Sequence, residues 1–182
     1  MAALPAQAHH LMELTGMAPT PLNGLLSGLA HPVIGPDHLL FLLALALVAW
    51  RRPLMWVMVL LGVGMLGSAS GLLWPALPGA ELLVSLSLVV EALVILERLP
   101  AALLLPAMAL HGYVLSGSVL GWNSMPLATY LLGLVCSQLV LLVLTQTVIK
   151  RAAISLNPSG RRLVAVALLG LGGFWALTQV MA

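Results

Sequence analysis

The chain has 182 residues, of which 62% are hydrophobic and only 7% are charged, and its formal net charge is +2. Soluble domains carry about 25% charged residues, so this composition excludes an ordinary soluble domain and predicts an integral membrane protein. The basic residues are scattered over several loops, which argues against nucleic-acid binding. A single cysteine, Cys136, excludes an internal disulfide and a site built of thiolates.

Residues 1–21 form the first segment, which we expect to be a short extracytoplasmic tail. The segment has neither the basic head nor the long apolar run of a secretory signal, so no signal peptide is expected. It holds His9, His10 and Glu13 and no Lys or Arg. His9 and His10 could concentrate a metal ion outside the membrane, or they could be ordinary residues of a terminal tail.

The remaining residues, 22–182, are expected to fold as one transmembrane domain. A spanning helix needs about 20 apolar residues, and Pro, Gly, Trp and Arg divide this part of the chain into six such segments. We therefore predict an all-α, polytopic bundle of six transmembrane helices with a broken first helix. The predicted spans are Leu22–Trp50, Pro53–Trp74, Gly79–Glu97, Leu99–Gly121, Pro126–Ile149 and Arg161–Met181.

The basic residues predict the orientation of this bundle. All seven Lys and Arg residues fall in the loops that follow the first, third and fifth predicted spans. Loops rich in Lys and Arg stay in the cytoplasm. The sequence therefore predicts that both termini lie outside.

The octapeptide from His31 to His38, His-Pro-Val-Ile-Gly-Pro-Asp-His, lies at the head of the apolar run 39–50. Its two prolines and its glycine should break the helix and free backbone carbonyls, which membrane proteins tolerate where they line a cavity. An ionisable side chain in hydrocarbon costs about 2.5 to 3.5 kcal/mol and usually has a function. This combination is typical of an ion site in a transporter.

Other ionisable residues are expected near the same depth. Glu81 should lie at the outer mouth of the third span, Glu91 near or below its midplane, and His111 about halfway through the fourth span. We therefore predict a metal site that opens to the outside between spans one, three and four. The candidate ligands are His31, Asp37, His38, Glu81 and His111, and the candidate pathway residues are Glu91, Ser85 and Gln138.

Structural alternatives remain open at each of these positions. On an unbroken helix Asp37 would point away from the face shared by His31 and His38. Either the break turns its carboxylate toward the site, or Asp37 holds His38 in one tautomer, or it caps a helix that begins at His38. Glu81 could instead stabilise a helix N-terminus. Glu91 could form a structural hydrogen bond, and His111 could be a packing residue.

Several glycine patterns have a structural interpretation. Gly62-x-Gly64-x-x-Gly67 matches a dinucleotide-binding fingerprint, but no strand precedes it, so the required context is missing. Small residues let membrane helices approach closely. We expect such packing faces at Gly62–Gly71, which includes Ser68 and Ser70, and at Gly24-x-x-x-Gly28 and Gly117-x-x-x-Gly121.

The motif His31-x5-Asp37-His38, with Glu81 and His111-Gly112, resembles the HupE/UreJ family of small bacterial membrane proteins. The likeness covers residues 24–144. Members of this family are implicated in nickel supply to hydrogenases and ureases, so the resemblance implies a permease for nickel or cobalt in the bacterial inner membrane. The fourth span of the family usually carries a second His and a Glu, where this chain has Leu115 and Ser118.

We therefore predict a permease that moves a divalent transition metal, Ni²⁺ in the first place and Co²⁺ in the second, into the cytoplasm. The predicted partners are the metal ion and the lipid bilayer, without nucleic acid, prosthetic group or enzymatic activity. The sequence leaves open whether copies of the chain form a homo-oligomer. Two alternatives are a non-transporting accessory or assembly subunit and an intramembrane metalloenzyme, although the chain lacks an His-Glu-x-x-His helix.

Overall fold

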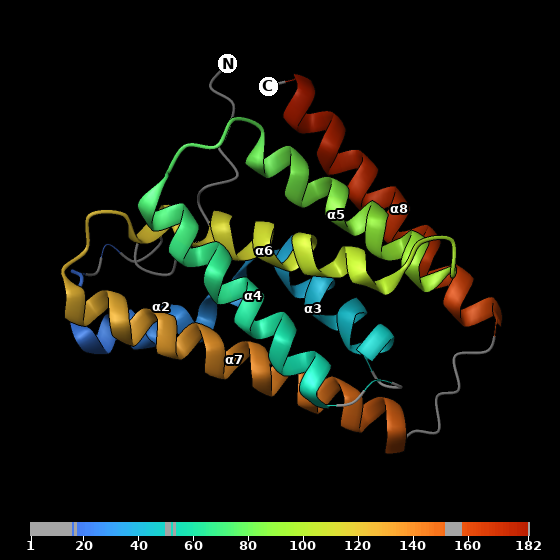
Figure 1. Cartoon of the computed structure of the whole chain (residues 1–182), viewed down its shortest axis with the longest axis horizontal. Coiled ribbons are helices and arrows are strands. Elements are labelled where there is room, and N and C mark those ends of the chain that lie inside the picture. Colours follow the sequence, from blue (N-terminus) through green and yellow to red (C-terminus); the bar gives the residue numbers. More distant parts are fainter. Residues whose placement is uncertain (1–15, 17, 50–51, 53, 152–157, 182) are drawn as a thin grey trace.

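The computed structural model describes residues 16, 18–49, 52, 54–151 and 158–181, and all regular structure within these ranges is helical (Figure 1). This confirms the predicted all-α class. His9, His10 and Glu13 lie outside the described residues. The α-helices are α2 (Pro21–Ile34), α3 (Pro36–Ala49), α4 (Leu54–Leu73), α5 (Ala80–Ile95), α6 (Leu104–Leu115), α7 (Ser124–Arg151) and α8 (Pro158–Met181), and short 3₁₀ turns, η1 (Ala101–Leu103) and η2 (Gly117–Val119), flank α6.

Each of the six predicted spans has a helical counterpart, but the helices differ in length. Four segments within the described ranges are long and apolar enough to cross a membrane: Met55–Leu73, Ala101–Val119, Ser124–Arg151 and Pro158–Met181. The bent pair α2 and α3 makes a fifth crossing if it forms one span. With 16 residues, α5 is about 24 Å long, less than the roughly 30 Å of a bilayer core.

The break in the first span lies where the sequence predicts it. The hydroxyl of Thr20 accepts a hydrogen bond from the backbone N–H of Asn23 at 3.2 Å, which caps the start of α2. At the other end, Gly35 adopts an extended conformation between the two helices. Pro36 then begins α3, because proline favours the first position of a helix and has no N–H to continue the preceding one. The two helices are bent by 74°.

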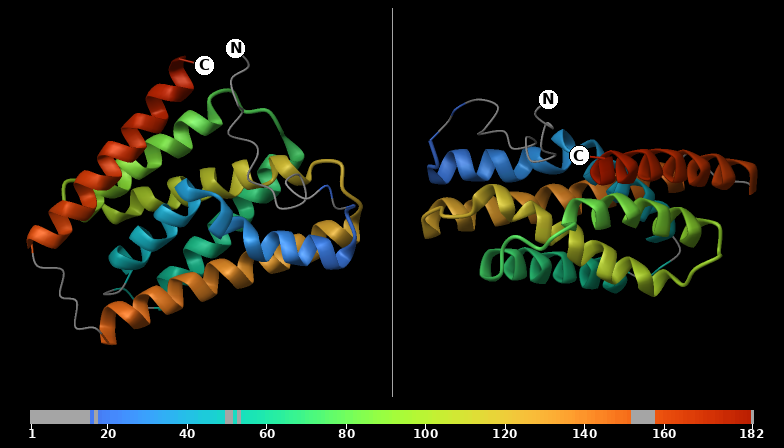
Figure 2. Two further views of the ribbon diagram at one scale, coloured as in Figure 1. Left: turned by 180° about the vertical axis from the view of Figure 1, so that it is seen from behind. Right: turned by 90° about the horizontal axis from the view of Figure 1, so that it is seen from above.

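The helices pack in long pairs that connect distant parts of the sequence. α2 lies along α7, α4 along α6, and α5 along α8, while α3 contacts both α7 and α5 (Figures 1 and 2). Pairing of α2 with α7 holds one arm of the broken span against the fifth predicted span. The other arm, α3, enters the core, where Phe41 and Leu45 are fully buried.

Glycines allow two of these pairs to approach closely, as predicted. A Cβ atom at Gly28 would clash with the backbone of Tyr130 on α7, and one at Gly112 on α6 would clash with the backbone of Gly64 on α4. The prediction for Gly62, Gly117 and Gly121 is wrong, because a Cβ atom at any of these positions meets no described atom within 4 Å. The last two have a common reason. These two glycines lie beyond the end of α6 rather than on a packed helix face.

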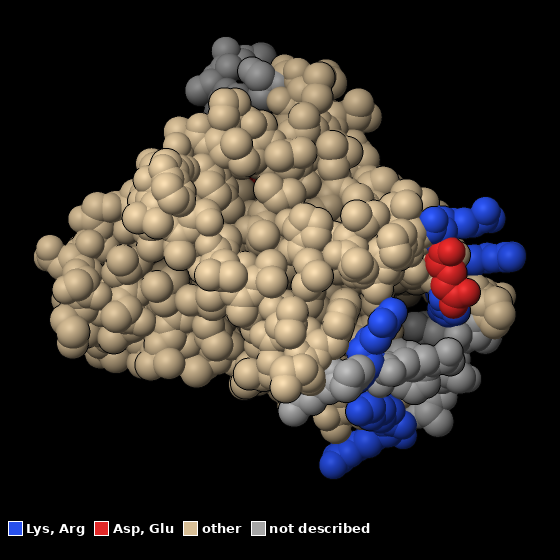
Figure 3. All heavy atoms as spheres, in the orientation of Figure 1, with Lys and Arg blue, Asp and Glu red and all other residues tan. Residues whose placement is uncertain are grey.

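The described Lys and Arg side chains gather at one end of the molecule (Figure 3). They come from the α3–α4 and α5–α6 connections and from the facing ends of α7 and α8. At this end Arg161 donates hydrogen bonds to the carbonyl oxygen of Ile95, at 2.5 Å, and to Oε1 of Glu97, at 2.7 Å. This contact ties the start of α8 to the end of α5.

Candidate functional site

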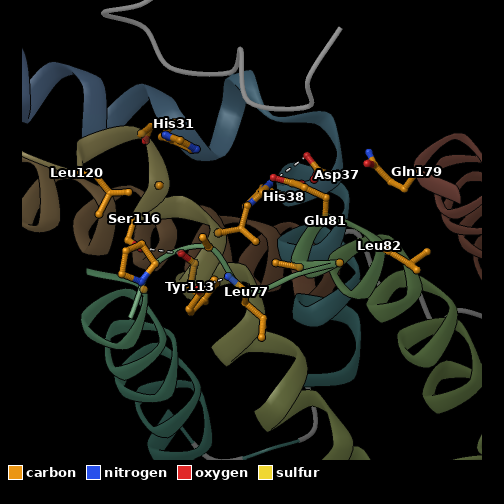
Figure 4. Close-up of a pocket in the computed structure, with 18 of the residues that line it drawn as sticks. His31, Asp37, His38, Leu77, Glu81, Leu82, Tyr113, Ser116, Leu120 and Gln179 are labelled. Carbon is orange, nitrogen blue, oxygen red and sulfur yellow. Dashed lines mark hydrogen bonds and ion pairs between the residues drawn. The ribbon is translucent and has the colours of Figure 1, made fainter. Parts of the chain in front are cut away.

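A cavity of about 600 Å³ lies at the end of the molecule away from the basic residues. His31 comes to it from α2, Asp37 and His38 from α3, and Glu81 from the first turn of α5 (Figure 4). The α4–α5 connection, the end of α6 and the last turn of α8 form its rim. None of the described residues that line it is Lys or Arg. The cavity is therefore open and lined by histidine and carboxylate side chains but not by Lys or Arg.

The α4–α5 connection is held in place at this rim by Tyr113. The hydroxyl of Tyr113 accepts the backbone N–H of Leu77 at 2.8 Å and donates to the carbonyl of Trp74 at 2.7 Å. A side chain of α6 thereby fixes the loop that leads into Glu81.

Asp37 and His38 form a close pair at the start of α3. Oδ1 of Asp37 lies 3.0 Å from Nδ1 of His38. Asp37 is the second residue of α3, so the expectation that it caps a helix beginning at His38 is wrong; Pro36 takes the first helical position instead. The helix break brings the carboxylate to the cavity wall, where it also contacts His38. Nε2 of His38 has no hydrogen-bond partner among the described residues.

His111 lies behind His38, deeper in the protein. Its ring meets that of His38 edge to face, with ring centres 4.8 Å apart, and Phe41 stacks on it at 4.0 Å. A second, small void of about 10 Å³ lies against His38, His111 and Gln138 and is otherwise lined mainly by apolar residues such as Phe41. His38 lines both spaces and separates the open cavity from the small void.

His31 is fixed by a residue of α7. The hydroxyl oxygen of Tyr130 lies 3.0 Å from Nδ1 of His31 and 3.2 Å from the carbonyl oxygen of Leu115. The rings of His31 and His38 are 5.9 Å apart between centres, across the bend between α2 and α3. The bend therefore brings both histidines to one cavity from two differently directed helices.

The candidate pathway residues are placed differently from one another. Gln138 lines the small void. Ser85 donates a hydrogen bond to the backbone carbonyl of Glu81 at 3.0 Å, and neither Ser85 nor Glu91 is among the described residues that line the two spaces. Glu91 is fully buried, and neither of its carboxyl oxygens has a hydrogen-bond partner in the described part of the chain. The predicted hydrogen bond of Glu91 is thus not seen there.

The predicted ligands are neighbours without forming a closed metal cage. Within the described ranges, no three His, Cys, Asp or Glu side chains form a group that could hold a metal ion as they stand. The imidazoles nevertheless follow one another from the open cavity inward, from His31 to His38 to His111.

The sequence did not single out three residues that contact the predicted ligands. These are Phe41, which stacks on His111, Tyr130, which contacts His31, and Ser87, which contacts His111 at 2.8 Å. A signal existed for Tyr130, because a buried tyrosine hydroxyl needs a polar partner. For Phe41 and Ser87 no local pattern distinguishes them from packing residues.

The two positions where the fourth span departs from the HupE/UreJ pattern also lie at the site. Leu115, in place of the second His, lines the small void. Ser118, in place of the Glu, lines the open cavity. Neither position therefore offers an imidazole or a carboxylate to the two spaces that the remaining histidines border.

Comparison with known proteins leads to the same family as the sequence motif. The family model described as HupE / UreJ protein matches residues 1–176. Searches of curated proteins and of solved structures gave no match to the chain. A match over nearly the whole length, together with the apolar helices and the His-Asp-His site, shows that this chain belongs to the HupE/UreJ family.

Proposed function

We propose that this protein is a permease that carries a divalent transition metal into the cytoplasm, with nickel as the favoured substrate and cobalt as the second. The metal would supply the maturation of enzymes such as hydrogenase or urease. The observation that carries the proposal is the meeting of two imidazoles and two carboxylates on one open cavity, with a third imidazole directly behind them. The family's association with nickel and cobalt transport supports it.

The chemistry of these side chains suits such an ion. Imidazole is a good ligand for nickel, and carboxylates add oxygen ligands and negative charge. Asp37 and Glu81, when ionised, would balance the two charges of the ion. We assign His31, His38 and His111 as ligands, Asp37 as a ligand or as the group that orients His38, and Glu81 as the residue that attracts the ion at the mouth.

The two spaces support passage in two steps. A water molecule occupies about 30 Å³ in the liquid, so the open cavity of about 600 Å³ has room for an ion with its hydration shell. The void of about 10 Å³ has room for at most one water molecule. An ion that moves from His38 to His111 must therefore leave most of its water behind.

On the inner side the path is closed in this conformation. Phe41, Leu42 and Met108 line the small void and are almost completely buried. Helix movement is then needed before the ion passes Gln138. We propose that Glu91 serves the inward step, because a fully buried carboxyl without a hydrogen-bond partner among the described residues is costly to keep for packing alone. Ser85, one turn after Glu81, donates its hydroxyl hydrogen to the backbone of Glu81.

The distribution of charge supports inward transport. The basic end should face the cytoplasm by the positive-inside rule, which places the open cavity and both termini outside, in the inner membrane of a bacterium. An inside-negative potential favours entry of a dication by about 4.6 kcal/mol per 100 mV. No separate energy source is needed for net uptake down this gradient.

The substrate range tests the proposal. The purified protein is reconstituted into liposomes that contain a metal-sensitive fluorescent chelator, and Ni²⁺, Co²⁺, Zn²⁺ or Mg²⁺ is added outside. We expect saturable entry of nickel and cobalt that increases with an inside-negative potential, and no entry of magnesium, which prefers oxygen ligands. Protein-free liposomes are the control. A folded protein that admits none of these metals would favour the accessory-subunit alternative.

A further inference from the structure

The two ring nitrogens of His111 have different surroundings. Nε2 lies 2.8 Å from the hydroxyl oxygen of Ser87, a residue of α5. Nδ1 is buried and has no hydrogen-bond partner among the described residues. One nitrogen is thus held by the protein, and the other has no partner in the described part of the chain, on a side chain that lines the small void.

The hydroxyl group of Ser87 determines which nitrogen carries the hydrogen. Its oxygen also lies 2.6 Å from the backbone carbonyl oxygen of Val84. Two oxygens at this distance need a hydrogen between them, and a hydroxyl has only one to donate. Ser87 therefore donates to Val84 and accepts from His111. The ring nitrogen that faces Ser87, Nε2, must carry a hydrogen.

We propose that Ser87 is a positioning residue for His111, which it holds in the Nε2–H tautomer so that Nδ1 is the nitrogen that binds the transported cation. The inference rests on the proposed function, since it names the atom that the ion would meet. Hydrogen bonds to the second nitrogen are the usual means of orienting a metal-binding histidine. Ser87 does this from α5, one turn before Glu91.

A similar argument assigns the opposite ring nitrogen of His38 to the cation. Nδ1 of His38 lies 3.0 Å from Oδ1 of Asp37, which leaves the opposite nitrogen, Nε2, for a cation, and neither ring nitrogen has a hydrogen-bond partner in the described part of the chain. His38 and His111 both border the void of about 10 Å³. The pair thus offers one lone pair from each ring, Nε2 of His38 and Nδ1 of His111, to a cation that has lost its water.

A direct test reads the tautomer by NMR without any metal. The protein is labelled with ¹⁵N-histidine in detergent micelles, and the His111 signals are assigned by their loss in His111→Asn. We expect the Nε2–H tautomer in the wild type and in Ser87→Thr, which keeps the hydroxyl, and a loss of this preference in Ser87→Ala. A wild-type His111 that carries its hydrogen on Nδ1 would overturn the proposal.

Nickel binding to the purified protein tests whether the orientation of His111 by Ser87 contributes to metal affinity. Removal of groups that orient a ligand weakens metal binding about 10- to 100-fold, and we expect a loss in this range for Ser87→Ala, with recovery in Ser87→Thr. Ser137→Ala is the matched control, because within the described residues this buried hydroxyl on α7 shares its one hydrogen between the backbone carbonyls of Gly28 and Leu134. Unchanged affinity in Ser87→Ala would contradict the inference.

A pair of substitutions at His111 itself identifies the binding nitrogen. The amide oxygen of asparagine can take the place of Nδ1, whereas that of glutamine reaches closer to the place of Nε2. We therefore expect tighter nickel binding by His111→Asn than by His111→Gln, and the reverse order would overturn the assignment. The NMR experiment involves no metal, so it tests the tautomer independently of transport. If the wild type has the Nε2–H tautomer but does not transport nickel, the result contradicts the proposed function alone.

Discussion

Tyr130 on α7 brings its hydroxyl oxygen to 3.0 Å from Nδ1 of His31 on α2, although 99 positions separate the two residues in the sequence. The same oxygen lies 3.2 Å from the carbonyl oxygen of Leu115 on α6. A single hydroxyl group therefore joins three helices at the edge of the open cavity. The pairing of α2 with α7 makes this contact possible, because Gly28 lets the two backbones meet beside Tyr130.

Tyr130→Phe removes this hydroxyl and keeps the fully buried ring. A typical intramolecular hydrogen bond contributes about 1 kcal/mol, so we expect a small decrease in thermal stability in detergent. His31 would lose its orientation, and the KM for nickel uptake should rise about fivefold, which corresponds to the same 1 kcal/mol. A KM equal to that of the wild type would show that the contact does not position His31.

Asp37→Asn tests the charge of the Asp37–His38 pair. The amide keeps the size of the side chain but removes one of the two carboxylates at the cavity, the one whose Oδ1 lies 3.0 Å from Nδ1 of His38. We expect nickel affinity, measured by equilibrium dialysis, to fall about 10- to 100-fold. Glu97→Gln is the matched control, because the side chain of Glu97 is 75% exposed and pairs with Arg161 at the basic end. Equal losses in both variants would contradict a local role for Asp37.

Straightening the first span should abolish transport while preserving the helices. Replacing Gly35 and Pro36 together by alanine supplies the N–H group that proline lacks and favours a continuous helix. His31 and His38 would then leave the positions that bring both to the cavity. We expect an unchanged helical circular dichroism spectrum and loss of nickel uptake. Pro106→Ala is the control for the loss of a proline, since Pro106 lies exposed in the first turn of α6.

Gly112→Ala should separate α6 from α4, because the new Cβ atom would meet the backbone of Gly64. Overpacking of this kind typically costs about 1 to 3 kcal/mol, and here it displaces the neighbour of His111 as well. We expect lower thermal stability and weaker nickel binding. Gly62→Ala on α4, where the added methyl group meets no described atom within 4 Å, should change neither. A similar decrease in both variants would point to a general effect of glycine replacement.

Local features of the sequence predicted most of the fold. Apolar run lengths gave the helical segments, and Gly35 and Pro36 gave the break, because both depend on neighbouring residues alone. The expectation that Pro32 also breaks the helix is wrong, since Pro32 lies inside α2. The 74° bend and the short length of α5 were not predicted. They depend on how the helices pack, which no local pattern encodes. Close packing was predicted at Gly28 and at Gly117. It is found at Gly28 but not at Gly117, since α6 ends before that residue.

The sequence also predicted only part of the candidate site, because local features identify single residues but not contacts between helices. The cost of ionisable groups in hydrocarbon identified the histidines and carboxylates without reference to their neighbours. Their supporting contacts were missed because Ser87 and Tyr130 reach them from other helices, 24 and 99 positions away in the sequence. Whether Asp37 caps a helix depends on where α3 begins. The helix begins at Pro36, one residue before Asp37.

The central claim is that nickel enters through the cavity at His38, and the initial rate of radioactive nickel uptake into proteoliposomes tests it most directly. Wild type, His38→Ala and the control Ser137→Ala are compared under an inside-negative potential. The account predicts saturable uptake by the wild type and by Ser137→Ala, and at least a tenfold loss in His38→Ala, from removal of a ligand that lines both spaces. Equal rates in wild type and His38→Ala, or no uptake by a folded wild type, would contradict it.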